Sequence, residues 1–487
     1  MKKFENDVQK IKYKVLKEVA SLAFKGTLQE EMQEIPDRII EGNKARFRCC
    51  IYKEKAIIEE RVKLALGGQK KENKWVEVID IACDECPIDR FTVTEACRGC
   101  LAHHCQEVCP ANAIIIIDQR SYINQEKCIE CGRCKKSCPY DAISERVRPC
   151  NKACGVGAIT IDEKRKASID YDKCIQCGAC VYRCPFGAIE DRSSIVDVVE
   201  KLRNKKKQVF ALVAPAISSQ FPPAKIGQVV TAIKKLGFHD VIEVALGADI
   251  VAYEESKEFA TTIEDRGTLT TSCCPSFVEL IYKNYPTLTK HISTTVSPMV
   301  AIGRMVKNMH PHSEVVFFGP CIAKKMEAQK EDVKDAIDYV LTFEELNALL
   351  DGAGIDIEEC DEDSLDNASY YGRIFARSGG VSQALEQALA EQNLQEELRA
   401  IQCQGVDECN KALKILKAGK LEHNVIEGMI CQGGCIGGPS SLTHKPKDKN
   451  EVDKYAKLAM EKSPLSALRI FDLENIHLHR NHNEEEK

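Results

Sequence analysis

The chain has 487 residues, with 68 Lys and Arg against 74 Asp and Glu and a formal net charge of −6. This length is enough for two or three domains with separate cores. The near balance of charge excludes a strong field for nucleic acid or a membrane surface, and no run of eighteen apolar residues is present to cross a bilayer.

Residues 1–78 are predicted to form an N-terminal helical region. The opening stretch, "MKKFENDVQKIKYKVLKEVASLAF", has the spacing of an amphipathic helix and lacks the apolar run of a signal peptide. We therefore expect a soluble protein of the cytoplasm. Cys49 and Cys50 lie in a second helix-like stretch, "RFRCCIYKEKAIIEERVKLALG", where we expect them to be structural rather than metal ligands.

The chain contains 26 cysteines. In a reducing cytoplasm such a number indicates metal ligands rather than disulfides. Between residues 97 and 190 a Cys-x3-Cys, followed by Pro or Gly and then Ala-Ile, recurs four times: "CQEVCPANAI", "CKKSCPYDAI", "CNKACGVGAI" and "CVYRCPFGAI". An internal repeat of this kind predicts a repeated structural unit.

Two runs, beginning at Cys128 and Cys174, are complete as C-x2-C-x2-C-x3-C-P. In bacterial ferredoxins this run supplies three ligands to one 4Fe-4S cube and its fourth cysteine to a second cube. Zinc is the alternative for an isolated Cys-x2-Cys, but a closed zinc site gives no reason for the Cys-Pro that follows. The spacing therefore predicts iron–sulfur clusters.

The ferredoxin-like region, residues 79–192, has enough cysteines for four cubes. The next complete run begins 19 residues after Cys109 and 20 residues after Cys154, which predicts two modules of two cubes each. Four cubes so close together along the chain are expected to form a path for electrons. His103 and His104 are alternative ligands in the enlarged loop of the first copy, although we expect a surface role for them. The expected ligand sets are Cys97, Cys100, Cys105 and Cys138; Cys128, Cys131, Cys134 and Cys109; Cys174, Cys177, Cys180 and Cys154; and Cys83, Cys86, Cys150 and Cys184.

From about residue 205 the pattern changes to strands that alternate with helices. "QVFALVAPAI" and "DVIEVALGADI" read as buried strands, "IGQVVTAIKKLGF" as an amphipathic helix, and "SEVVFFGPCIAKK" as a strand that enters a loop. Residues 205–445 are therefore predicted to form an α/β domain with helices on the faces of mostly parallel sheet. The charged residues 446–487 are expected to form a C-terminal tail.

Further cysteines fall in loops that follow the predicted strands. In α/β folds ligands bind where strands end and loops begin. Because these cysteines are far apart in sequence, any shared site has to be assembled by the fold. Glycines crowd "EGMICQGGCIGGP", which suits a backbone that lies close to a bulky cofactor. The cysteines are Cys273, Cys274, Cys321, Cys431 and Cys435.

Three segments resemble the signature segments of FeFe hydrogenases, in the same order. They are "TSCCP", then Cys321 followed by x2-Lys-x2-Glu, and then "EGMICQGGCIGGP". With the ferredoxin repeats, the resemblance spans roughly residues 80–440. It implies a two-lobed α/β catalytic domain preceded by two ferredoxin-like α+β modules. The implied reaction is the reversible conversion of two protons and two electrons to H2.

The resemblance also implies the cofactors and partners. The active-site cofactor would be the H-cluster, a 4Fe-4S cube joined through one shared thiolate to a two-iron subsite with CO, cyanide and azadithiolate ligands. Four accessory 4Fe-4S clusters would carry electrons from a ferredoxin or a similar carrier. Maturation enzymes would install the two-iron subsite. Neither nucleic acid nor a membrane is expected as a partner.

The resemblance assigns roles to individual residues. Cys274, Cys321, Cys431 and Cys435 match the ligands of the H-cluster cube, and Cys435 matches the bridging thiolate. Lys324, whose motif Glu327 completes, matches the lysine that donates a hydrogen bond to a cyanide. The remaining matches are Met429, beside the bridging position, and Ala214 and Pro215 in "APA", which line the other cyanide.

A proton path is implied as well. Cys273 matches the thiol that exchanges protons with the azadithiolate amine, a role that suits an ordinary thiol pKa of about 8.5. Glu255, Ser293 and Glu258 fall at places comparable with the onward relay of the family, although the two glutamates could instead form one solvated face of a helix. The arginine that ends the relay has no clear counterpart, because Thr262 stands at its offset.

The sequence departs from the better-known members at three points. Ser276 and Phe277 replace Gly-Trp, Gly319 replaces Met, and "GGPSS" replaces a third glycine and Gln-Pro. These changes resemble the subgroup often called group B, and they alter the surroundings of the cofactor rather than its ligands. The alternative functions are an H2 sensor and an electron-transfer or cluster-assembly protein without turnover. Retention of Cys273 favours catalysis.

Overall fold

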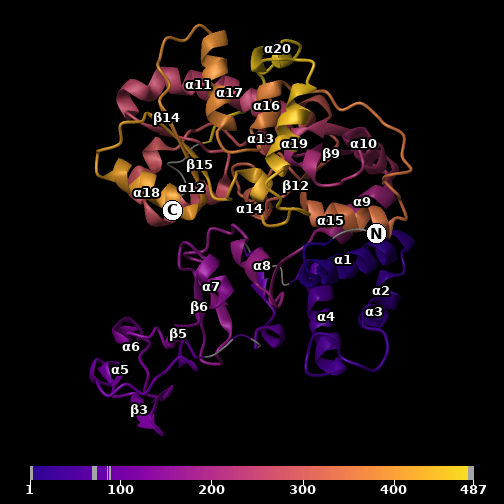
Figure 1. Ribbon diagram of the computed structural model, residues 1–487. Helices are drawn as coiled ribbons and strands as arrows, with labels where there is room; N and C mark the ends of the chain where they lie inside the picture. Colours follow the sequence, from indigo (N-terminus) through magenta and orange to yellow (C-terminus); the bar gives the residue numbers. More distant parts are fainter. Residues whose placement is uncertain (1–3, 69–73, 85, 87–88, 481–487) are drawn as a thin grey trace.

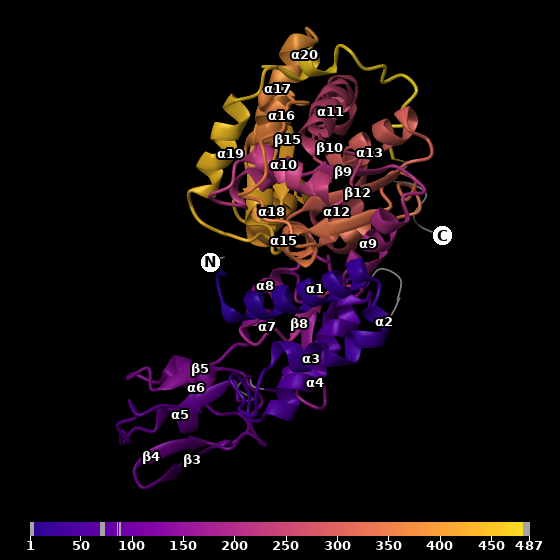
Figure 2. The same ribbon diagram turned by 90° about the vertical axis from the view of Figure 1, so that its right-hand side faces the viewer.

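The computed structural model describes residues 4–68, 74–84, 86 and 89–480. An α/β body occupies the upper part of Figure 1, and the ferredoxin-like region extends below it as an arm beside a group of N-terminal helices. Figure 2 shows the arm reaching away from the body, with α1 (Asp7–Lys25) at the junction. The expected fold class is confirmed.

The first helix joins the core of the α/β body. Asn6 caps α1 by accepting a hydrogen bond from the backbone N of Gln9 at 2.9 Å, and Gly26 ends it with a φ of +83°. The apolar face of α1 packs against α9 (Ile195–Asn204) and α15 (Phe343–Gly352), and Val19 is fully buried there. The other N-terminal helices are α2 (Leu28–Glu31), α3 (Ile35–Ile39) and α4 (Ile51–Ala65), with the 3-10 turn Met32–Glu34 between α2 and α3.

Cys49 and Cys50 are exposed and lie just before α4 rather than within it. The extended backbone at Cys50 makes it the N-cap residue of that helix. The apolar spacing predicted the helix correctly but not its first residue.

The arm is built from paired short strands. Antiparallel pairs β2–β5 and β3–β4 form its outer part, and β1–β8 and β6–β7 form its inner part. Two of the short helices begin after Gly132 and Gly178, whose φ values of +70° and +75° provide the left-handed turn between closely spaced cysteines. The elements are β1 (Val76–Val78), the 3-10 turn Asp80–Ala82, β2 (Phe91–Val93), α5 (His104–Glu107), β3 (Ile114–Ile117), β4 (Arg120–Ile123), α6 (Arg133–Ser137), β5 (Ile143–Glu145), α7 (Pro149–Ala153), β6 (Ile159–Ile161), β7 (Ala167–Ile169), α8 (Ala179–Arg183) and β8 (Ile189–Asp191).

The α/β body contains two parallel sheets, in the orders β10-β9-β12-β13 and β11-β15-β14. Strands β9 and β12 are buried along their whole length, which is typical of parallel strands covered on both faces. The strands are β9 (Val209–Val213), β10 (Asp240–Glu243), β11 (Leu269–Thr270), β12 (Glu314–Gly319), β13 (Tyr339–Thr342), β14 (Ala400–Gln404) and β15 (Val425–Met429).

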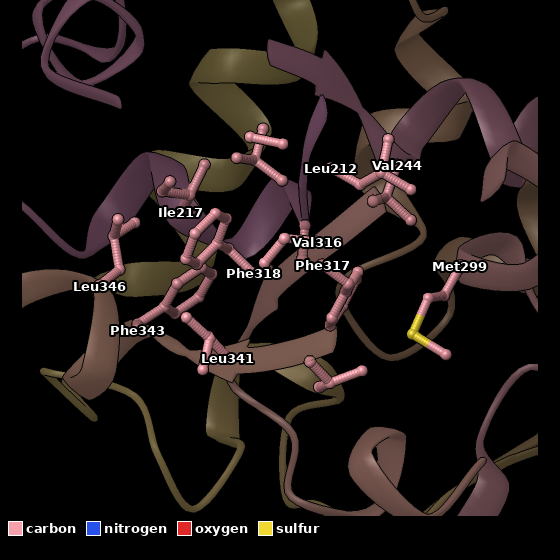
Figure 3. Packing of buried hydrophobic residues seen from close by; sticks show 14 of the residues in the cluster. Leu212, Ile217, Val244, Met299, Val316, Phe317, Phe318, Leu341, Phe343 and Leu346 are labelled. Carbon is pink, nitrogen blue, oxygen red and sulfur yellow. The ribbon is translucent and has the colours of Figure 1, made fainter. Parts of the chain in front are cut away.

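Helices cover both sheets, as Figure 1 shows. Figure 3 shows the core of the larger sheet, where Phe318 of β12 lies with Leu212 and Phe343. The remaining helices are α10 (Ile226–Lys235), α11 (Val244–Arg266), α12 (Pro275–Asn284), α13 (Pro298–Met309), α14 (Ala323–Glu327), α16 (Tyr370–Ile374), α17 (Gly380–Glu391), α18 (Gly405–Lys417), α19 (Asp448–Lys457) and α20 (Pro464–Leu468), with 3-10 turns at Pro215–Ser219, Pro286–His291 and Cys435–Gly437. In the part of the chain that the structure describes, no helix is both long enough and apolar enough to cross a membrane.

The region after residue 445 is not a simple tail. Its described part forms α19 and α20 and then an extended segment that returns to the body. Val452 and Leu478 are buried in the main core there, although the surrounding residues are charged. Composition alone did not predict this packing, because the buried apolar residues are few, far apart and surrounded by charged residues.

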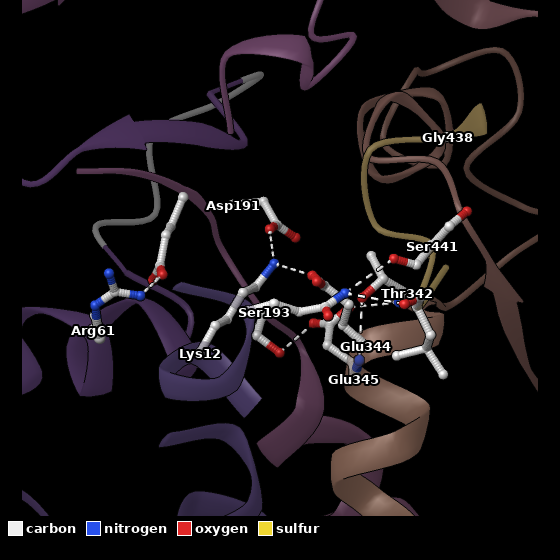
Figure 4. Close-up of polar contacts among 12 residues, drawn as sticks. Lys12, Arg61, Asp191, Ser193, Thr342, Glu344, Glu345, Gly438 and Ser441 are labelled. Carbon is white, nitrogen blue, oxygen red and sulfur yellow. Dashed lines mark hydrogen bonds and ion pairs between the residues drawn. The ribbon is translucent and has the colours of Figure 1, made fainter. Parts of the chain in front are cut away.

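A buried polar network joins the arm and α1 to the body (Figure 4). Lys12 Nζ lies 2.6 Å from Asp191 Oδ1 and 2.7 Å from Glu344 Oε2. Lys325 Nζ lies 2.8 Å from Asp191 Oδ2 and 3.0 Å from Glu345 Oε2. Burial favours neutral Asp191, but the two ammonium groups outweigh it and hold the pKa of that carboxyl below its ordinary range. The network fixes the end of β8 against α14 and α15.

Candidate metal centre and proton path

Four cysteines follow the carboxyl ends of parallel strands in the body. Cys274 caps α12 shortly after β11, and Cys431 lies two residues after β15. Cys321 lies two residues after β12, and Cys435 begins a 3-10 turn. Because β12 belongs to one sheet and β11 and β15 to the other, the four cysteines come together between the two sheets.

The four thiols lie near enough to influence one another. Burial and the nearby Cys274 together raise the pKa of Cys321 to about 11, and burial with Cys321 and Cys274 raises the pKa of Cys435 to about 12. Burial raises the pKa of Cys431 well above its ordinary value, and Cys321, Cys274 and Cys435 add to the effect. Thiols in this state become thiolates when they bind metal.

The thiols suit a cluster rather than a single ion. Thiolates are the ligands that iron–sulfur clusters prefer, and a cube binds each of its four cysteines at a different iron. Among the described residues, no three Cys, His, Asp or Glu side chains converge closely enough to hold one metal ion. A cube needs no such convergence.

Cys435 differs from the other three cysteines because it is exposed. Enough protein still surrounds its thiol for burial to raise the pKa. The preceding Gly434 has a φ of +91°, and a Cβ added there would lie 2.9 Å from Met429 Sδ. Glycine is therefore required for the turn that presents Cys435 beside Met429.

Two further predicted residues lie at the edge of the larger sheet. Ala214 follows β9 and donates its backbone N–H to Phe318 O at 2.9 Å, and Pro215 begins the next 3-10 turn. A Cβ added to Gly319, at the end of β12, would lie 3.4 Å from the Cβ of Ala214. The "APA" turn and the loop that leads to Cys321 are thus neighbours.

Phe277, one of the departures from the family pattern, occupies a packed position. Its ring is fully buried, and a Cβ added at Gly428 of β15 would lie 2.2 Å from it. Ser276, next to it, is also buried. The Ser-Phe pair therefore packs directly over the strand that leads to Met429 and Cys431.

Lys324 is the cation that these cysteines share. Its Nζ donates to Cys273 O at 3.2 Å and to Glu327 Oε2 at 2.6 Å. Its charge lowers the pKa of Cys273, Cys274, Cys321 and Cys435 and so opposes the effect of their burial. The helix α14, which pairs Lys324 and Glu327 one turn apart, thus directs a positive charge at the cysteine cluster.

Cys273 faces a buried carboxyl group. Burial raises the pKa of Cys273, and the nearby Glu255 raises it further. Neither carboxyl oxygen of Glu255 accepts a hydrogen bond of good geometry among the described residues, but Ser293 and the backbone of Ser272 lie close enough to act on it. Burial, helped by the charge of Glu258, raises the pKa of Glu255 to about 8, although hydrogen bonding by Ser293 and Ser272 opposes the shift. The thiol and this carboxyl group are adjacent acids in an apolar setting.

The next groups lead from Glu255 toward the surface. Ser293 Oγ donates to Glu258 Oε2 at 2.7 Å, and Arg266 Nη1 lies 3.0 Å from Glu258 Oε1. Burial raises the pKa of Glu258, but hydrogen bonds from Thr294 and Ser293 and the charge of Arg266 outweigh it, so the net pKa is lowered. The side chain of Arg266 is 24% exposed.

The arginine at the end of this series was missed in the sequence. Thr262, which stands at the family offset, uses its hydroxyl to bind the backbone O of Glu258 at 2.7 Å. Arg266, eight residues after Glu258 on α11, reaches the carboxylate instead. The only available signal was a basic residue in the last turn of a predicted helix.

The arm brings three predicted ligand sets together. Burial raises the pKa of Cys134, Cys150 and Cys180, and in each case other members of the same predicted set raise it further. For the first set, Cys105 and Cys138 pack in one small core, and Cys105 Sγ lies 3.3 Å from Ser121 Oγ. The second set, Cys109, Cys128, Cys131 and Cys134, lines one small cavity.

The inner end of the arm reaches the four-cysteine cluster of the body. Cys177 raises the pKa of Cys431, and Cys274 raises that of Cys177. Cys177 and Cys431 also line one cleft of about 1050 Å³ between α7, α8, the start of α18 and the loop after β15.

His104, in the outer module, is exposed and lies 3.5 Å from Glu107.

Comparisons with known proteins place these features in a family. A family model described as "Iron only hydrogenase large subunit, C-terminal domain" matches residues 207–439, and a "4Fe-4S binding domain" model matches residues 121–144 and 167–190. Iron hydrogenase 1 of Clostridium pasteurianum is 29% identical over 400 residues, which cover 71% of this chain and 69% of the relative. The periplasmic Fe hydrogenase large subunit of Nitratidesulfovibrio vulgaris is 30% identical over 372 residues, which cover 65% of this chain and 85% of the relative.

Two other matches bear on fold and function. A solved FeFe-hydrogenase structure superposes with a TM-score of 0.50 at 19% identity and covers 59% of this chain and 98% of that chain. At this identity it supports the fold alone. A probable cytosolic Fe-S cluster assembly factor of Culex quinquefasciatus is 26% identical over 265 residues, which cover 43% of this chain and 55% of the relative.

Proposed function

Because the chain belongs to the iron-only hydrogenase family, we propose that it is an iron–sulfur oxidoreductase that catalyses the reversible reduction of protons to H2. The observation that carries the proposal is the arrangement at Cys273. This thiol lies beside the four-cysteine cluster and faces Glu255, a buried carboxyl group whose pKa is raised to about 8. A protein that only stores or transfers clusters has no use for such an acid–base pair.

The donor set fits the H-cluster. We propose that Cys274, Cys321, Cys431 and Cys435 hold its cube and that Cys435, the accessible member, is shared with the two-iron subsite. When bound, this cofactor supplies the metal that takes the hydride and the amine that takes the proton. The residues proposed to contact the subsite are Lys324, held by Glu327, with Met429, Ala214 and Pro215.

The side chains on the proton path have fitting acidities. Glu258 remains ionised near neutral pH and receives protons beside Arg266, the partly exposed last residue of α11. The hydroxyl of Ser293 then passes a proton toward Glu255, whose pKa of about 8 lets it gain and lose protons near neutrality. Glu255 in turn exchanges a proton with Cys273 Sγ. Burial of Glu255 and Ser293 keeps bulk water out of this exchange.

Electrons would arrive through the arm. We propose that the outer cubes accept them from a ferredoxin or a similar carrier and that the cube held by Cys154, Cys174, Cys177 and Cys180 delivers them to the catalytic cube. The proximity of Cys177 to Cys274 and Cys431 supports this last transfer. We further propose a cytoplasmic location, membership in the group B subgroup, and maturation by enzymes that install the two-iron subsite.

The second candidate is an iron–sulfur protein without turnover, either a cluster-assembly factor or an H2 sensor. The likeness to a probable cytosolic Fe-S cluster assembly factor favours it. That role needs the cysteines but not the path from Cys273 to Arg266. The two candidates therefore predict different effects of substitutions along the path.

The proposal is tested by H2 evolution from a reduced dye under anoxic conditions. The chain is prepared from a host that has the hydrogenase maturation enzymes and, as a control, from a host that lacks them, and iron is counted in both samples. Both should contain cluster iron, but only the first should evolve H2. If neither evolves H2 although the first holds its full cluster iron, the second candidate is the better account.

A further inference from the structure

The segment at the C-terminal end of the described chain is fixed against the proton path. Val296 N donates to Leu478 O at 2.9 Å, and Arg480 N donates to Thr294 O at 2.6 Å. Between them Thr295 and His479 form an antiparallel bridge. Leu478 is buried in the main core. The segment therefore runs beside the residues that follow Ser293, and its backbone is held in place.

This anchorage directs the side chain of Arg480 into the protein. Its Nη2 donates to Glu327 Oε1 at 2.6 Å, and its side chain is only 8% exposed. The other oxygen of Glu327 accepts from Lys324 Nζ at 2.6 Å and from Ser297 Oγ at 3.1 Å. One buried carboxylate thus lies between two cations that are 156 residues apart in the sequence.

The second cation changes what Lys324 can do. A buried lysine paired with one glutamate is neutralised by it, so the pair presents little charge to a third group. With Arg480 on the opposite oxygen, Glu327 is shared between two cations and neutralises Lys324 less than it would alone. Asp332 Oδ2 lies 3.6 Å from Arg480 Nε and balances part of the arginine charge from a side chain that is 30% exposed. The same two cations lower the pKa of Glu327 against the effect of its burial and keep it ionised. The donors on both oxygens also fix the plane of the carboxylate and so the direction of Lys324.

A second face of α14 is held in a comparable way. Lys325 is fully buried and pairs with Asp191 and Glu345. Since α14 has only five residues, contacts on both faces are needed to fix its orientation. Arg480 supplies the contact on the face that carries Lys324.

We propose that Arg480 is a positioning residue for the two-iron subsite: by binding Glu327, it holds Lys324 in place and keeps its charge directed at the catalytic cysteines. The inference rests on the proposed function and extends it to a residue outside the signature segments. The ligand that Lys324 would meet is an anionic diatomic group, for which a fixed, incompletely neutralised ammonium is a suitable donor.

The first test compares the matured protein with Arg480→Gln, Arg480→Lys and a matched control, Arg469→Gln. Arg469 pairs with Glu461 at 3.0 Å in the same region but is 68% exposed, so its loss should change nothing. In Arg480→Gln the cluster iron should be retained, one cyanide infrared band should move to lower wavenumber, and kcat should fall by about 10- to 100-fold with KM for the dye unchanged. Arg480→Lys should restore part of both. Infrared bands and a kcat equal to those of the unchanged protein would overturn the inference.

The second test does not depend on the two-iron subsite. The midpoint potential of the catalytic cube is measured in protein from a host without maturation enzymes, for Arg480→Gln, Lys324→Met and the double variant. Arg480→Gln should lower the potential, and most of this shift should vanish in the Lys324→Met background, because Arg480 acts through Lys324. An equal shift in both backgrounds would show that Arg480 acts independently of Lys324 and would refute the inference. Missing CO and cyanide bands in the matured protein would instead refute the proposed function.

Discussion

Replacing Glu255 by Gln should make the protein relatively more stable at high pH. The carboxyl group has a pKa of about 8 in the folded protein and an ordinary value of 4.5. In the unfolded chain it therefore releases its proton at a lower pH than in the folded chain, so its presence costs stability as the pH rises from 4.5 to about 8. The difference corresponds to roughly 5 kcal/mol above about pH 8, as an upper bound. Gln has nearly the same shape and does not ionise.

The assay is thermal unfolding of both proteins, in the same metal state, from about pH 5 to about pH 9. The Tm of Glu255→Gln relative to the unchanged protein should rise with pH. Glu258→Gln is the matched control of opposite sign, because its carboxylate has a lowered pKa and contributes stability that is lost only in acid. Between about pH 5 and about pH 9 its relative Tm should stay low and change little with pH, because the recovery falls below the ordinary pKa of 4.5. A Tm difference for Glu255→Gln that does not vary with pH would refute the reasoning.

Three further substitutions test other parts of the path and its surroundings. Cys273→Ala should keep the CO and cyanide infrared bands but lower H2 evolution by at least about 100-fold, since general acid–base catalysis contributes about that much; unchanged evolution would contradict the relay. Arg266→Gln removes the cation from Glu258 and should raise the pKa of that carboxyl and shift the pH profile of kcat upward, whereas an unchanged profile would show that Arg266 is not part of the path. Phe277→Trp, which restores the more familiar residue, should overpack the site beside Gly428 and lower the free energy of unfolding by about 1–3 kcal/mol, measured by denaturant unfolding. An equal or higher stability would show that β15 can move to accommodate the larger ring.

The sequence predicted the elements whose burial dictates their composition. Strands β9 and β12 are apolar throughout because helices cover both faces of their sheet, and that run of residues is visible without the structure. The complete cysteine runs are equally visible, because a 4Fe-4S cube fixes the spacing of its ligands within one turn. The family models match the two complete runs.

Contacts over long sequence distances could not be predicted in the same way. The amphipathic pattern of α1 shows that one face is buried, but nothing in it indicates that its partner is α15, more than 300 residues away. Arg480 and Glu327 form an ion pair although they are far apart in the sequence, and Arg480 alone resembles a solvated charge. Arg266 was missed for a related reason, since the helix carries it to Glu258 from two turns away instead of from the expected offset.

We propose above all that the four-cysteine site holds an H-cluster with a two-iron subsite. Infrared spectroscopy of protein from a maturation-competent host tests it most directly, because CO and cyanide bound to iron absorb where the protein does not. The account predicts bands of both ligands, which should be absent from protein made without the maturation enzymes. A matured sample with full cluster iron and no such bands would contradict the account.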